Sequence, residues 1–445
     1  MNDTIAAIST PRGFGGIGVV RVSGPAALEI SNKVFSQKIE KPNFVYVGNV
    51  IDPKINEPMD TCVAIYFRAP HSYTGEDVVE LQMHGGLKNI DLILKYILGF
   101  GARVAEKGEF TKRAVLNGKM DLIQAEAVIE LIEAKTEKAL KASSKKLFGD
   151  LSKEIEEIKS KLVSLLASVE APIDFPFDAE SIDRSEFEKK LKEIILEVRQ
   201  LLGSYKTGKS LQEGFKVVIS GKPNVGKSTL LNALLKFERA IVSETPGTTR
   251  DTIEELIDFY GIPIRIIDTA GFRETRDKVE QLGLDRTLKA INESDLILFV
   301  FDVSEEISEE DKKLLEISSD RNRILVVNKT DLPQKVDINL LKGYLKGEEI
   351  VEISALLKQG IEELEEKMYR KLLHDETEAP LITTEREKLF LERVLSHLEN
   401  SSRIFEDAII VEELREALEE FGSLSSSNAS LTVMDEIFSK FCIGK

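Results

Sequence analysis

Short apolar runs separated by glycine and proline make up most of the first 117 residues. IGVVRVSG, FVYVGNV, CVAIYF and VVELQMHGG each have the composition of a β-strand, and LKNIDLILKYILGFG among them has the apolar spacing of a helix. Strands that outnumber helices in this way predict an α+β domain.

The pattern becomes helical from Met120 onward. Residues 125–171 combine good helix formers with apolar positions at helical spacing, and Gly149 is their only glycine or proline. The segment IDFPFD ends this run, and the polar residues after Asp183 open a second helix. Residues 207–214, TGKSLQEG, are predicted to be a linker.

Residues 215–372 alternate between helical patterns and the apolar runs FKVVISG, IRIIDTAG, LILFVFDV and ILVVNKTD. Continuous apolar runs are expected where parallel strands are covered on both faces. After Leu373 the chain returns to acidic amphipathic helices, which are too short and too polar to form a large core alone. These helices are therefore expected to pack on the earlier ones.

The pattern as a whole predicts a multidomain α/β fold. An N-terminal α+β domain over residues 1–118 is followed by a discontinuous α-helical domain, residues 119–210 and 373–445, with an α/β domain inserted at 211–372. The length of 445 residues independently indicates about three domains.

Charge is distributed unevenly along the chain. The net charge is −17 overall, +1 over residues 1–117 (13 Lys and Arg against 12 Asp and Glu) and −9 over residues 373–445 (7 against 16). A chain this acidic is a poor candidate for coating nucleic acid nonspecifically, because phosphate binding needs clustered cations. An anionic ligand is therefore expected on the N-terminal part.

Cysteine and histidine are too sparse for a disulfide framework or a histidine-rich metal site. Cys62 and Cys442 are far apart, and the four histidines are widely spaced. The sequence has no run of roughly 18 apolar residues, so no membrane span is expected. MNDTIAAISTPRG lacks the basic and apolar parts of a secretory signal, and a cytoplasmic location is expected.

A phosphate-binding sequence lies between an apolar strand and a helix. GKPNVGKS, residues 221–228, has the spacing G-x-x-x-x-G-K-[ST] in the strand–loop–helix context that this motif requires. Its glycines let the backbone wrap around phosphates, and the amides at the helix start point toward the anion. Lys227 is expected to reach the β- and γ-phosphates, and the Ser228 hydroxyl to hold Mg²⁺.

Further motifs follow on the expected ends of later strands. Asp268 of DTAG suits a water-mediated Mg²⁺ contact, and the amide of Gly271 suits the γ-phosphate. Asp331 of NKTD can accept from both N–H groups of guanine, whereas adenine would leave that carboxylate unpaired. Asn328 and Lys329 are expected to brace the loop and cover the base.

Ser354 and Ala355 follow the strand EIVEI and can contact the guanine carbonyl through a backbone amide. Together with the earlier motifs they predict GTP rather than ATP. The domain resembles the Ras-like P-loop GTPases of the TrmE/Era group, and GTTRD at 247–251 resembles their switch I. The nucleotide site implied by the resemblance consists of Asn224, Val225, Gly226, Lys227, Ser228, Thr229, Ser243, Glu244, Thr245, Pro246, Gly247, Thr248, Thr249, Asp268, Thr269, Ala270, Gly271, Asn328, Lys329, Asp331, Ser354 and Ala355.

Position 272 holds Phe where Ras-type GTPases carry a glutamine that orients water, so hydrolysis needs another device. Similar GTPases without that glutamine use K⁺ in place of an arginine finger, because a cation there offsets transition-state charge. The residues that the resemblance implies as K⁺ ligands are Asn224, Ser243, Thr245 and Thr248.

Two further catalytic elements come from the same resemblance. Thr249 is implied to close on Mg²⁺ together with Ser228. Glu280 in KVEQLG matches the acid that acts on the attacking water. Arg250 is an alternative as an arginine finger, although packing within switch I is its favoured role.

Four segments in order resemble the MnmE (TrmE) family of tRNA-modification GTPases: TIAAISTPRGFGGIGVVRVSG, SYTGEDVVELQMHGG, GEFTKRAVLNGKMDLIQAEAV and the terminal FCIGK. The resemblance extends over nearly the whole chain. It implies joint action with the FAD-containing partner MnmG (GidA), in a heterotetramer or larger assembly. Together they add an aminomethyl or carboxymethylaminomethyl group to C5 of the wobble uridine (U34) of certain tRNAs.

The same resemblance implies a ligand for the N-terminal domain. The one-carbon donor is 5,10-methylene- or 5-formyl-tetrahydrofolate, and the domain that binds it also forms the homodimer. GTP hydrolysis is implied to depend on K⁺ and to be triggered when two G domains meet.

Residues of the N-terminal part fit a folate. Arg21 and Lys119 can meet the carboxylates of its glutamate tail, and Glu80 can accept from the N–H groups of its pterin. The resemblance implies that these three residues line the pocket together with the terminal Lys445.

The terminal FCIGK has three interpretations. As a prenylation signal it is poor, because its third position is Gly, its last is Lys and no polybasic stretch precedes it. A frayed end is the simplest structure for a terminus. The resemblance instead places the tail at the folate site, where Cys442 either attacks C6 of uridine as a thiolate or packs and positions Lys445.

Two other function classes compete with this interpretation. A ribosome-assembly or RNA-binding GTPase like Era would carry a basic RNA-binding module such as a KH-like domain, whereas the C-terminal segment here is acidic and helical. A Ras-like membrane switch would rest on the tail alone. The sequence therefore favours a GTP-hydrolysing enzyme of tRNA modification.

Overall fold

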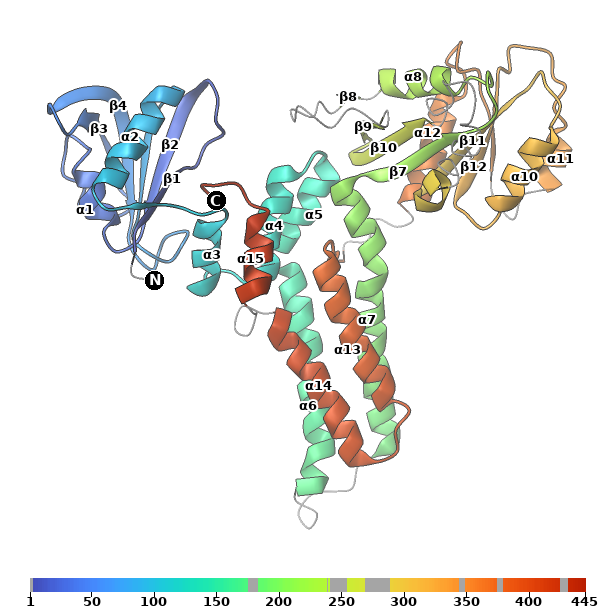
Figure 1. Cartoon of the computed structure of the whole chain (residues 1–445). Coiled ribbons are helices and arrows are strands. Elements are labelled where there is room, and N and C mark those ends of the chain that lie inside the picture. The colour runs from blue at the N-terminus through green and yellow to red at the C-terminus, as the bar shows by residue number, and fades with distance from the viewer. Residues whose placement is uncertain are drawn as a thin grey trace, which may run out of the picture. The chain divides into compact units, whose positions relative to one another are not determined.

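The computed structural model describes residues 3–174, 183–237, 239–240, 254–268, 289–343, 349–373, 379–424 and 431–445 (Figure 1). The chain forms two compact units. The first contains Met1–Ile129, Lys146–Val198 and Leu389–Lys445, and the second contains Glu130–Lys145 and Arg199–Lys388. The predicted domain segments divide the chain more finely than these units do, and their boundaries stay predictions.

A six-stranded sheet forms the N-terminal part of the first unit. Its strand order is β3-β4-β5-β2-β1-β6, with β1 and β6 parallel and the other neighbours antiparallel. The strands are β1 (Ile5–Ile8), β2 (Gly15–Ser23), β3 (Val45–Asp52), β4 (Glu57–Phe67), β5 (Val78–Gly85) and β6 (Arg103–Val104). The short β1 and β6 were not expected from the sequence, whereas the predicted α+β composition is confirmed.

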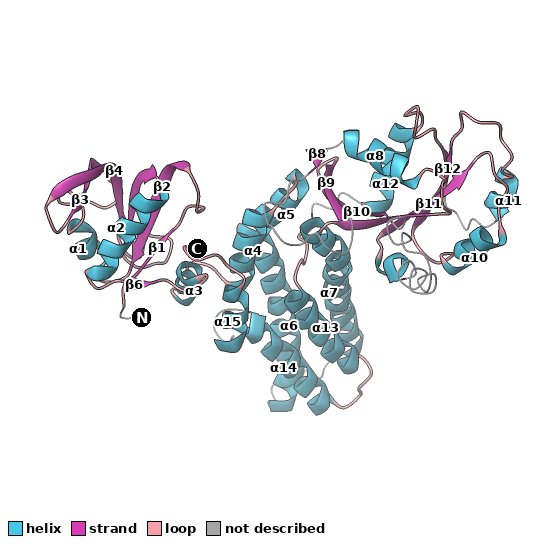
Figure 2. Ribbon diagram, turned by 45° about the horizontal axis from the view of Figure 1, so that its top comes forward, coloured by secondary structure: helices cyan, strands magenta, loops and turns pink. Residues whose placement is uncertain are grey.

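Helices α1 (Ala27–Asn32) and α2 (Leu87–Gly99) cover one face of this sheet, as Figure 2 shows. Leu81 of β5 lies in the core that these helices form, whereas Glu80 before it points to the opposite face. The register of β2 on β5 puts Arg21 directly opposite Glu80. Strand alternation thus brings two charged side chains together on the face away from α1 and α2.

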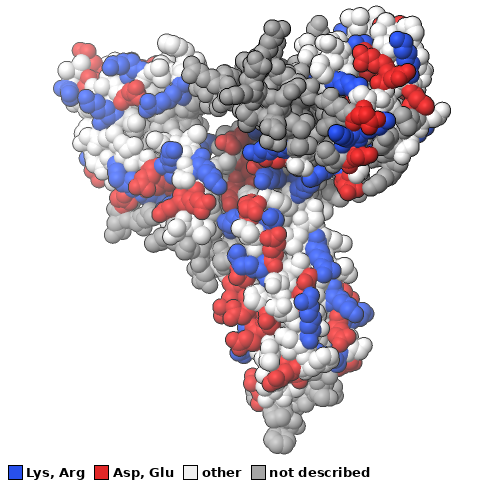
Figure 3. All heavy atoms as spheres, turned by 45° about the vertical axis from the view of Figure 1, so that its right-hand side comes forward, with Lys and Arg blue, Asp and Glu red and all other residues white. Residues whose placement is uncertain are grey.

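Helices from distant parts of the sequence pack together in the first unit. α6 (Asp150–Asp174) lies beside α14 (Asp407–Leu424), and Arg415 pairs with Glu170 across them at an Nη2–Oε1 distance of 2.7 Å. On the face drawn in Figure 3, acidic and basic side chains are interspersed along the helices. The prediction that the late helices pack on the earlier ones is confirmed.

The C-terminal helix of the first unit belongs to a second apolar cluster. α15 (Leu431–Ser439) brings Phe438 into contact with residues of α3 (Glu109–Leu116) and α4 (Leu122–Glu133). This packing delivers the terminal residues to the N-terminal part of the chain. The remaining helices of the helical segments are α5 (Glu137–Leu147), α7 (Arg184–Glu213) and α13 (Glu385–Ser401).

The second unit contains a seven-stranded sheet of order β13-β12-β11-β7-β10-β9-β8. The first five strands in this order, β13, β12, β11, β7 and β10, are parallel to one another. β9 is antiparallel to β10, and β8 is antiparallel to β9. All of β11 is buried because apolar clusters lie on both faces of the sheet, which confirms the predicted doubly covered sheet. The strands are β7 (Phe215–Ser220), β8 (Arg239–Ala240), β9 (Glu254–Phe259), β10 (Ile262–Asp268), β11 (Leu296–Asp302), β12 (Arg323–Asn328) and β13 (Ile350–Glu352). The helices around them are α8 (Lys227–Phe237), α10 (Glu309–Ile317), α11 (Ile338–Gly343) and α12 (Ile361–Leu372).

The predicted linker at residues 207–214 is wrong, because α7 continues to Glu213. Gly208 lies inside that helix, and a Cβ there would stand 2.1 Å from the carbonyl oxygen of Ile382. Glycine at this position lets a neighbouring segment approach the helix closely, and it does not end the helix.

Two features are absent from the part of the chain that the structure describes. No helix in it is both long enough and apolar enough to span a membrane. No group of three or more His, Cys, Asp or Glu side chains in it is arranged to hold a metal ion.

Candidate functional site

The phosphate-binding loop joins β7 to α8 in the second unit. Gly221 has a φ of 143° and Gly226 a φ of 99°. A Cβ at Gly221 would stand 2.3 Å from the carbonyl oxygen of Val300, and a Cβ at Gly226 would stand 2.3 Å from Nδ2 of Asn328. Backbone conformation and space therefore both require glycine at these two positions.

Lys227 is buried at the start of α8 and donates to two carbonyls of the loop. Its Nζ lies 2.8 Å from O of Gly221 and 2.6 Å from O of Lys222. The predicted Mg²⁺ ligand Ser228 and its neighbour Thr229 follow in the first turn of the helix. The ammonium thus sits within the loop whose backbone would receive a phosphate.

Asn328 connects the phosphate-binding loop to the loop after β13. Its Nδ2 donates to O of Val225 at 2.8 Å, and its Oδ1 accepts from N of Ala355 at 3.0 Å. In the same loop, the Ser354 hydroxyl donates to Oδ1 of Asp331 at 2.6 Å. The structure therefore brings NKTD, Ser354, Ala355 and the phosphate-binding loop to one edge of the sheet.

Lys329 fixes the middle of the phosphate-binding loop. Its Nζ lies 2.7 Å from O of Asn224, which has a φ of 66°, and 2.5 Å from Oδ2 of Asp302. Burial alone would raise the pKa of the Asp302 carboxyl, but the bonds from Lys329 and Ser304 bring this pKa below its usual value. Sequence reasoning missed Asp302, although an acid at the end of a continuous apolar strand was an available signal.

Asp268 is the last residue of β10, and the parallel register places it beside Ile219 of β7. The backbone at Asp268 therefore lies at the same edge of the sheet as the phosphate-binding loop. The other predicted nucleotide and ion residues of this region lie outside the described residues: Ser243, Glu244, Thr245, Pro246, Gly247, Thr248, Thr249, Thr269, Ala270, Gly271 and Glu280. Arg250 and Phe272 lie outside them as well.

In the first unit, Arg21 and Glu80 form an ion pair on the face of the N-terminal sheet that lies away from α1 and α2. Nε and Nη2 of Arg21 lie 2.9 Å and 2.8 Å from Oε1 of Glu80, and the two side chains are only 16% and 18% exposed. The guanidinium carbon lies 5.4 Å from the ring centre of Tyr73 and 5.5 Å from that of Phe110. Sequence reasoning missed both aromatic residues, although each lies in a segment that carried the family resemblance.

An ion-pair network centred on a buried arginine lies next to these aromatic residues in the sequence. Arg113 of α3 is 1% exposed and pairs with Glu76, Glu109 and Asp3 at 2.9–3.0 Å. Glu76 lies three residues after Tyr73, and Glu109 directly precedes Phe110. The network therefore joins the segments that carry both rings.

The terminal residues make backbone contacts with the segment that carries Phe110. Ile443 forms a β-bridge with Lys107, and N of Phe110 donates to O of Lys445 at 3.2 Å. Gly444 has a φ of 101°, and a Cβ there would stand 2.1 Å from O of Ile8. The tail is therefore not a frayed end.

Lys445 is half-buried, and Cys442 near it is exposed. Burial and the positive charge of Arg21 lower the pKa of the Lys445 ammonium, while the charges of Glu80 and Cys442 oppose this shift. The structure thus places Arg21, Glu80 and Lys445 within electrostatic reach of one another. Lys119, the fourth predicted folate residue, instead donates to O of Pro70 at 3.0 Å.

Two family models match successive parts of the chain. The family model "GTP-binding protein TrmE N-terminus" matches residues 4–119, and "MnmE helical domain" matches residues 122–442. The chain is 45% identical to the tRNA modification GTPase MnmE of Carboxydothermus hydrogenoformans and 45% identical to that of Aquifex aeolicus, in both cases over 100% of each chain. It is 42% identical to that of Natranaerobius thermophilus, over 100% of this chain and 99% of the relative. Among solved structures, the G domain of the T. maritima FeoB iron transporter is 29% identical, with a TM-score of 0.27, over 36% of this chain and 99% of its own.

Proposed function

Because the chain belongs to the MnmE family of tRNA modification GTPases, we propose that it couples GTP hydrolysis to modification of C5 of the wobble uridine (U34) in certain tRNAs. The group added is aminomethyl or carboxymethylaminomethyl. The FAD-containing MnmG acts with this chain in a heterotetramer or larger assembly in the cytoplasm. The observation that carries this proposal is the placement of the terminal tail: Lys445 accepts from N of Phe110 through its carbonyl, and the Phe110 ring lies 5.5 Å from the guanidinium carbon of Arg21.

The test of this function is the mass of the wobble nucleoside. Transfer RNA from cells that lack the protein should lose the modified uridine, and the wild-type gene should restore it. Unchanged nucleosides in the deletion strain would contradict the proposal.

At the nucleotide site, each residue has a role that follows from its chemistry. Lys227 would leave the loop carbonyls for the β- and γ-phosphates, and Ser228 and Thr249 would hold Mg²⁺, which neutralises phosphate charge. Asp331 would accept from the guanine N–H groups, and Glu280 would act on the attacking water. The position of Asp331 beside Ser354 supports its role.

Potassium should accelerate hydrolysis. In solutions of equal ionic strength, we expect the rate in K⁺ to exceed that in Na⁺ by at least about tenfold, because a bound cation offsets transition-state charge. The implied ligands are Asn224, Ser243, Thr245 and Thr248. The support is that Lys329 fixes Asn224 in the loop through the backbone carbonyl of Asn224, a bond that does not use its side-chain amide.

The measurement is phosphate release by the full chain with each cation. An Asn224→Ala form should lose the difference between the cations while keeping the slow rate seen in Na⁺. Equal rates of the wild type in K⁺ and Na⁺ would remove the potassium site from the proposal.

The N-terminal site is proposed to bind 5,10-methylene- or 5-formyl-tetrahydrofolate through Arg21, Glu80, Lys119 and Lys445. In the full chain, Arg21→Ala should weaken binding of 5-formyl-tetrahydrofolate roughly tenfold to a hundredfold, since a charge-assisted contact is lost. Titration calorimetry measures the affinity. Arg12→Ala is the control, because Arg12 is 74% exposed in the loop between β1 and β2. Equal binding by both variants would take Arg21 out of the site.

We also infer that the N-terminal domain forms the homodimer. Val45 and Val47 of the edge strand β3 are 53% and 69% exposed, and Ile17 of β2 is 66% exposed. Apolar side chains on an open sheet favour cover by a second copy of the domain. We assign tRNA docking to the complex, because this chain has a net charge of −17 and phosphate binding needs clustered cations.

A further inference from the structure

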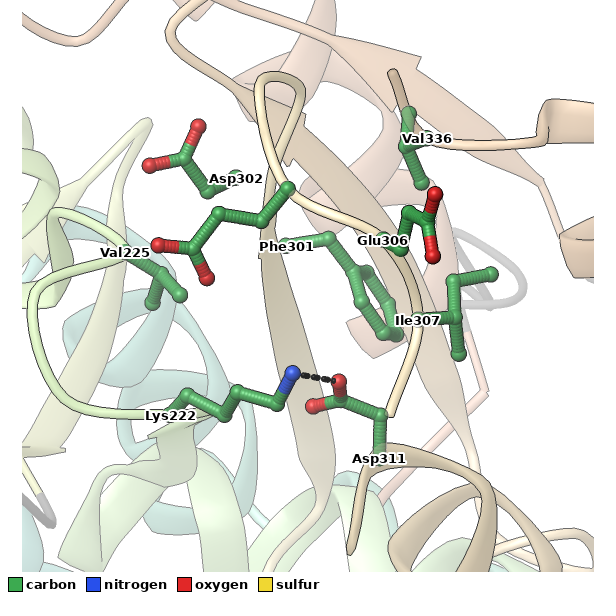
Figure 4. A pocket seen from close by; sticks show the side chains of 9 residues that line it. Lys222, Val225, Phe301, Asp302, Glu306, Ile307, Asp311 and Val336 are labelled. Atoms are coloured by element: carbon green, nitrogen blue, oxygen red, sulfur yellow. Dashed lines mark ion pairs between the residues drawn. The ribbon is translucent and has the colours of Figure 1, made fainter. Parts of the chain in front are cut away.

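Two carboxylates on either side of the connection between β11 and α10 are linked to the phosphate-binding loop, one through Lys329 and one directly. Asp302, the last residue of β11, accepts from Lys329, which in turn donates to the Asn224 carbonyl. Asp311, in the first turn of α10, pairs with Lys222 of the loop itself, at an Nζ–Oδ2 distance of 2.5 Å. Figure 4 shows the Lys222 side chain pointing across a small pocket toward Asp311.

Asp311 is held firmly in its own helix. Its Oδ2 accepts from N of Ser308 at 3.0 Å and from the Ser308 hydroxyl at 2.9 Å, which is the arrangement of a helix N-terminal cap. The Asp311 side chain is 4% exposed and that of Lys222 is 18% exposed. A pair this well covered is screened little by solvent, unlike an ion pair on the surface.

The two halves of the loop are fastened differently. Carbonyls of the second half, at Asn224 and Val225, accept from Lys329 and Asn328. In the first half, the side chain of Lys222 is tied to Asp311, and its carbonyl accepts from Lys227. The Lys222–Asp311 ion pair therefore restrains the first half of the loop. This half includes the Lys222 carbonyl, which accepts from Lys227.

We propose that the Lys222–Asp311 ion pair is a positioning element of the GTP site, which keeps the phosphate-binding loop in the shape that receives phosphates. A loop that is already ordered loses less conformational entropy on binding, so its affinity is higher. Lys222 acts through the loop backbone in this role and does not contact the nucleotide. The inference rests on the proposed GTP site at Lys227.

The test is the affinity of the full chain for the fluorescent nucleotide mant-GDP. Asp311→Asn keeps an oxygen for Ser308 but removes the charge, and Lys222→Met removes the cation. We expect each to weaken binding about tenfold and the double variant to be no weaker than either, because both break one contact. Lys222→Arg should bind within about threefold of the wild type, because the charge pair is retained.

The control is Glu309→Gln, which breaks an exposed ion pair with Lys312 (2.6 Å) in the same helix and should bind as the wild type does. Wild-type affinity in Asp311→Asn would overturn the proposal, even if its thermal stability fell. Weak binding by Lys222→Met alone would also overturn it, because Lys222 would then contact phosphate directly. A wild type that binds no mant-GDP would overturn the GTP site as well as the positioning pair.

Discussion

Replacing Asp331 with asparagine is expected to shift nucleotide preference from GTP to XTP. The carboxylate accepts from two N–H groups of guanine, whereas an amide would direct its own N–H toward them. Xanthine carries a carbonyl where guanine carries an amino group, so the donor and acceptor pattern is restored. We expect GTP affinity to fall by roughly a hundredfold or more, since polar groups are left unpaired in the site.

The geometry around Asp331 sharpens this expectation. The buried Ser354 hydroxyl donates to Oδ1 of Asp331 at 2.6 Å. In Asp331→Asn the amide oxygen can keep that bond, which leaves the amide N–H₂ to face the base. Competition of GTP and XTP for bound mant-GDP measures the shift, and Asp337→Asn in the same unit is the control. Unchanged GTP affinity in Asp331→Asn would show that NKTD does not recognise the base.

The nucleotide site was predictable where local sequence determines local geometry. Gly221 and Gly226 have conformations that glycine favours, and Asp331 follows a buried strand by three residues. Asp311 could not be found in this way, because an acid in the first turn of an amphipathic helix is normally a capping residue on the surface. Its pairing with Lys222 depends on how α10 packs beside the loop, which no local pattern records.

The errors in the sequence interpretation have the same origin. Gly208 looks like a linker residue, yet its role is to admit the Ile382 carbonyl against a continuous helix. Tyr73 and Phe110 look like ordinary aromatic residues until the sheet register places Arg21 near both rings. In each case the decisive neighbour is distant in sequence, so propensity and periodicity carry no information about it.

The second large effect is expected from a substitution in the C-terminal tail, because Gly444 has no room for a side chain. Gly444→Val should remove Lys445 from the site and abolish both folate binding and wobble-uridine modification. A Cβ would stand 2.1 Å from O of Ile8, and valine is strongly disfavoured at a φ of 101°. Gly99→Val is the matched control, because nothing lies within 4 Å of a Cβ at that position.

The substitution Cys442→Ser distinguishes the position of the tail from a chemical role of its sulfur. The tail is held by backbone contacts, including N of Gly108 to O of Cys442 at 3.4 Å, so this exchange should leave the tail in place and folate binding intact. If the thiolate attacks C6 of uridine, modification should fall by several orders of magnitude, since a hydroxyl without a base is a far weaker nucleophile. Calorimetry with 5-formyl-tetrahydrofolate and mass analysis of U34 report the two properties separately. Normal modification in Cys442→Ser, together with its loss in Gly444→Val, would assign the tail to positioning Lys445 and exclude the sulfur from the reaction.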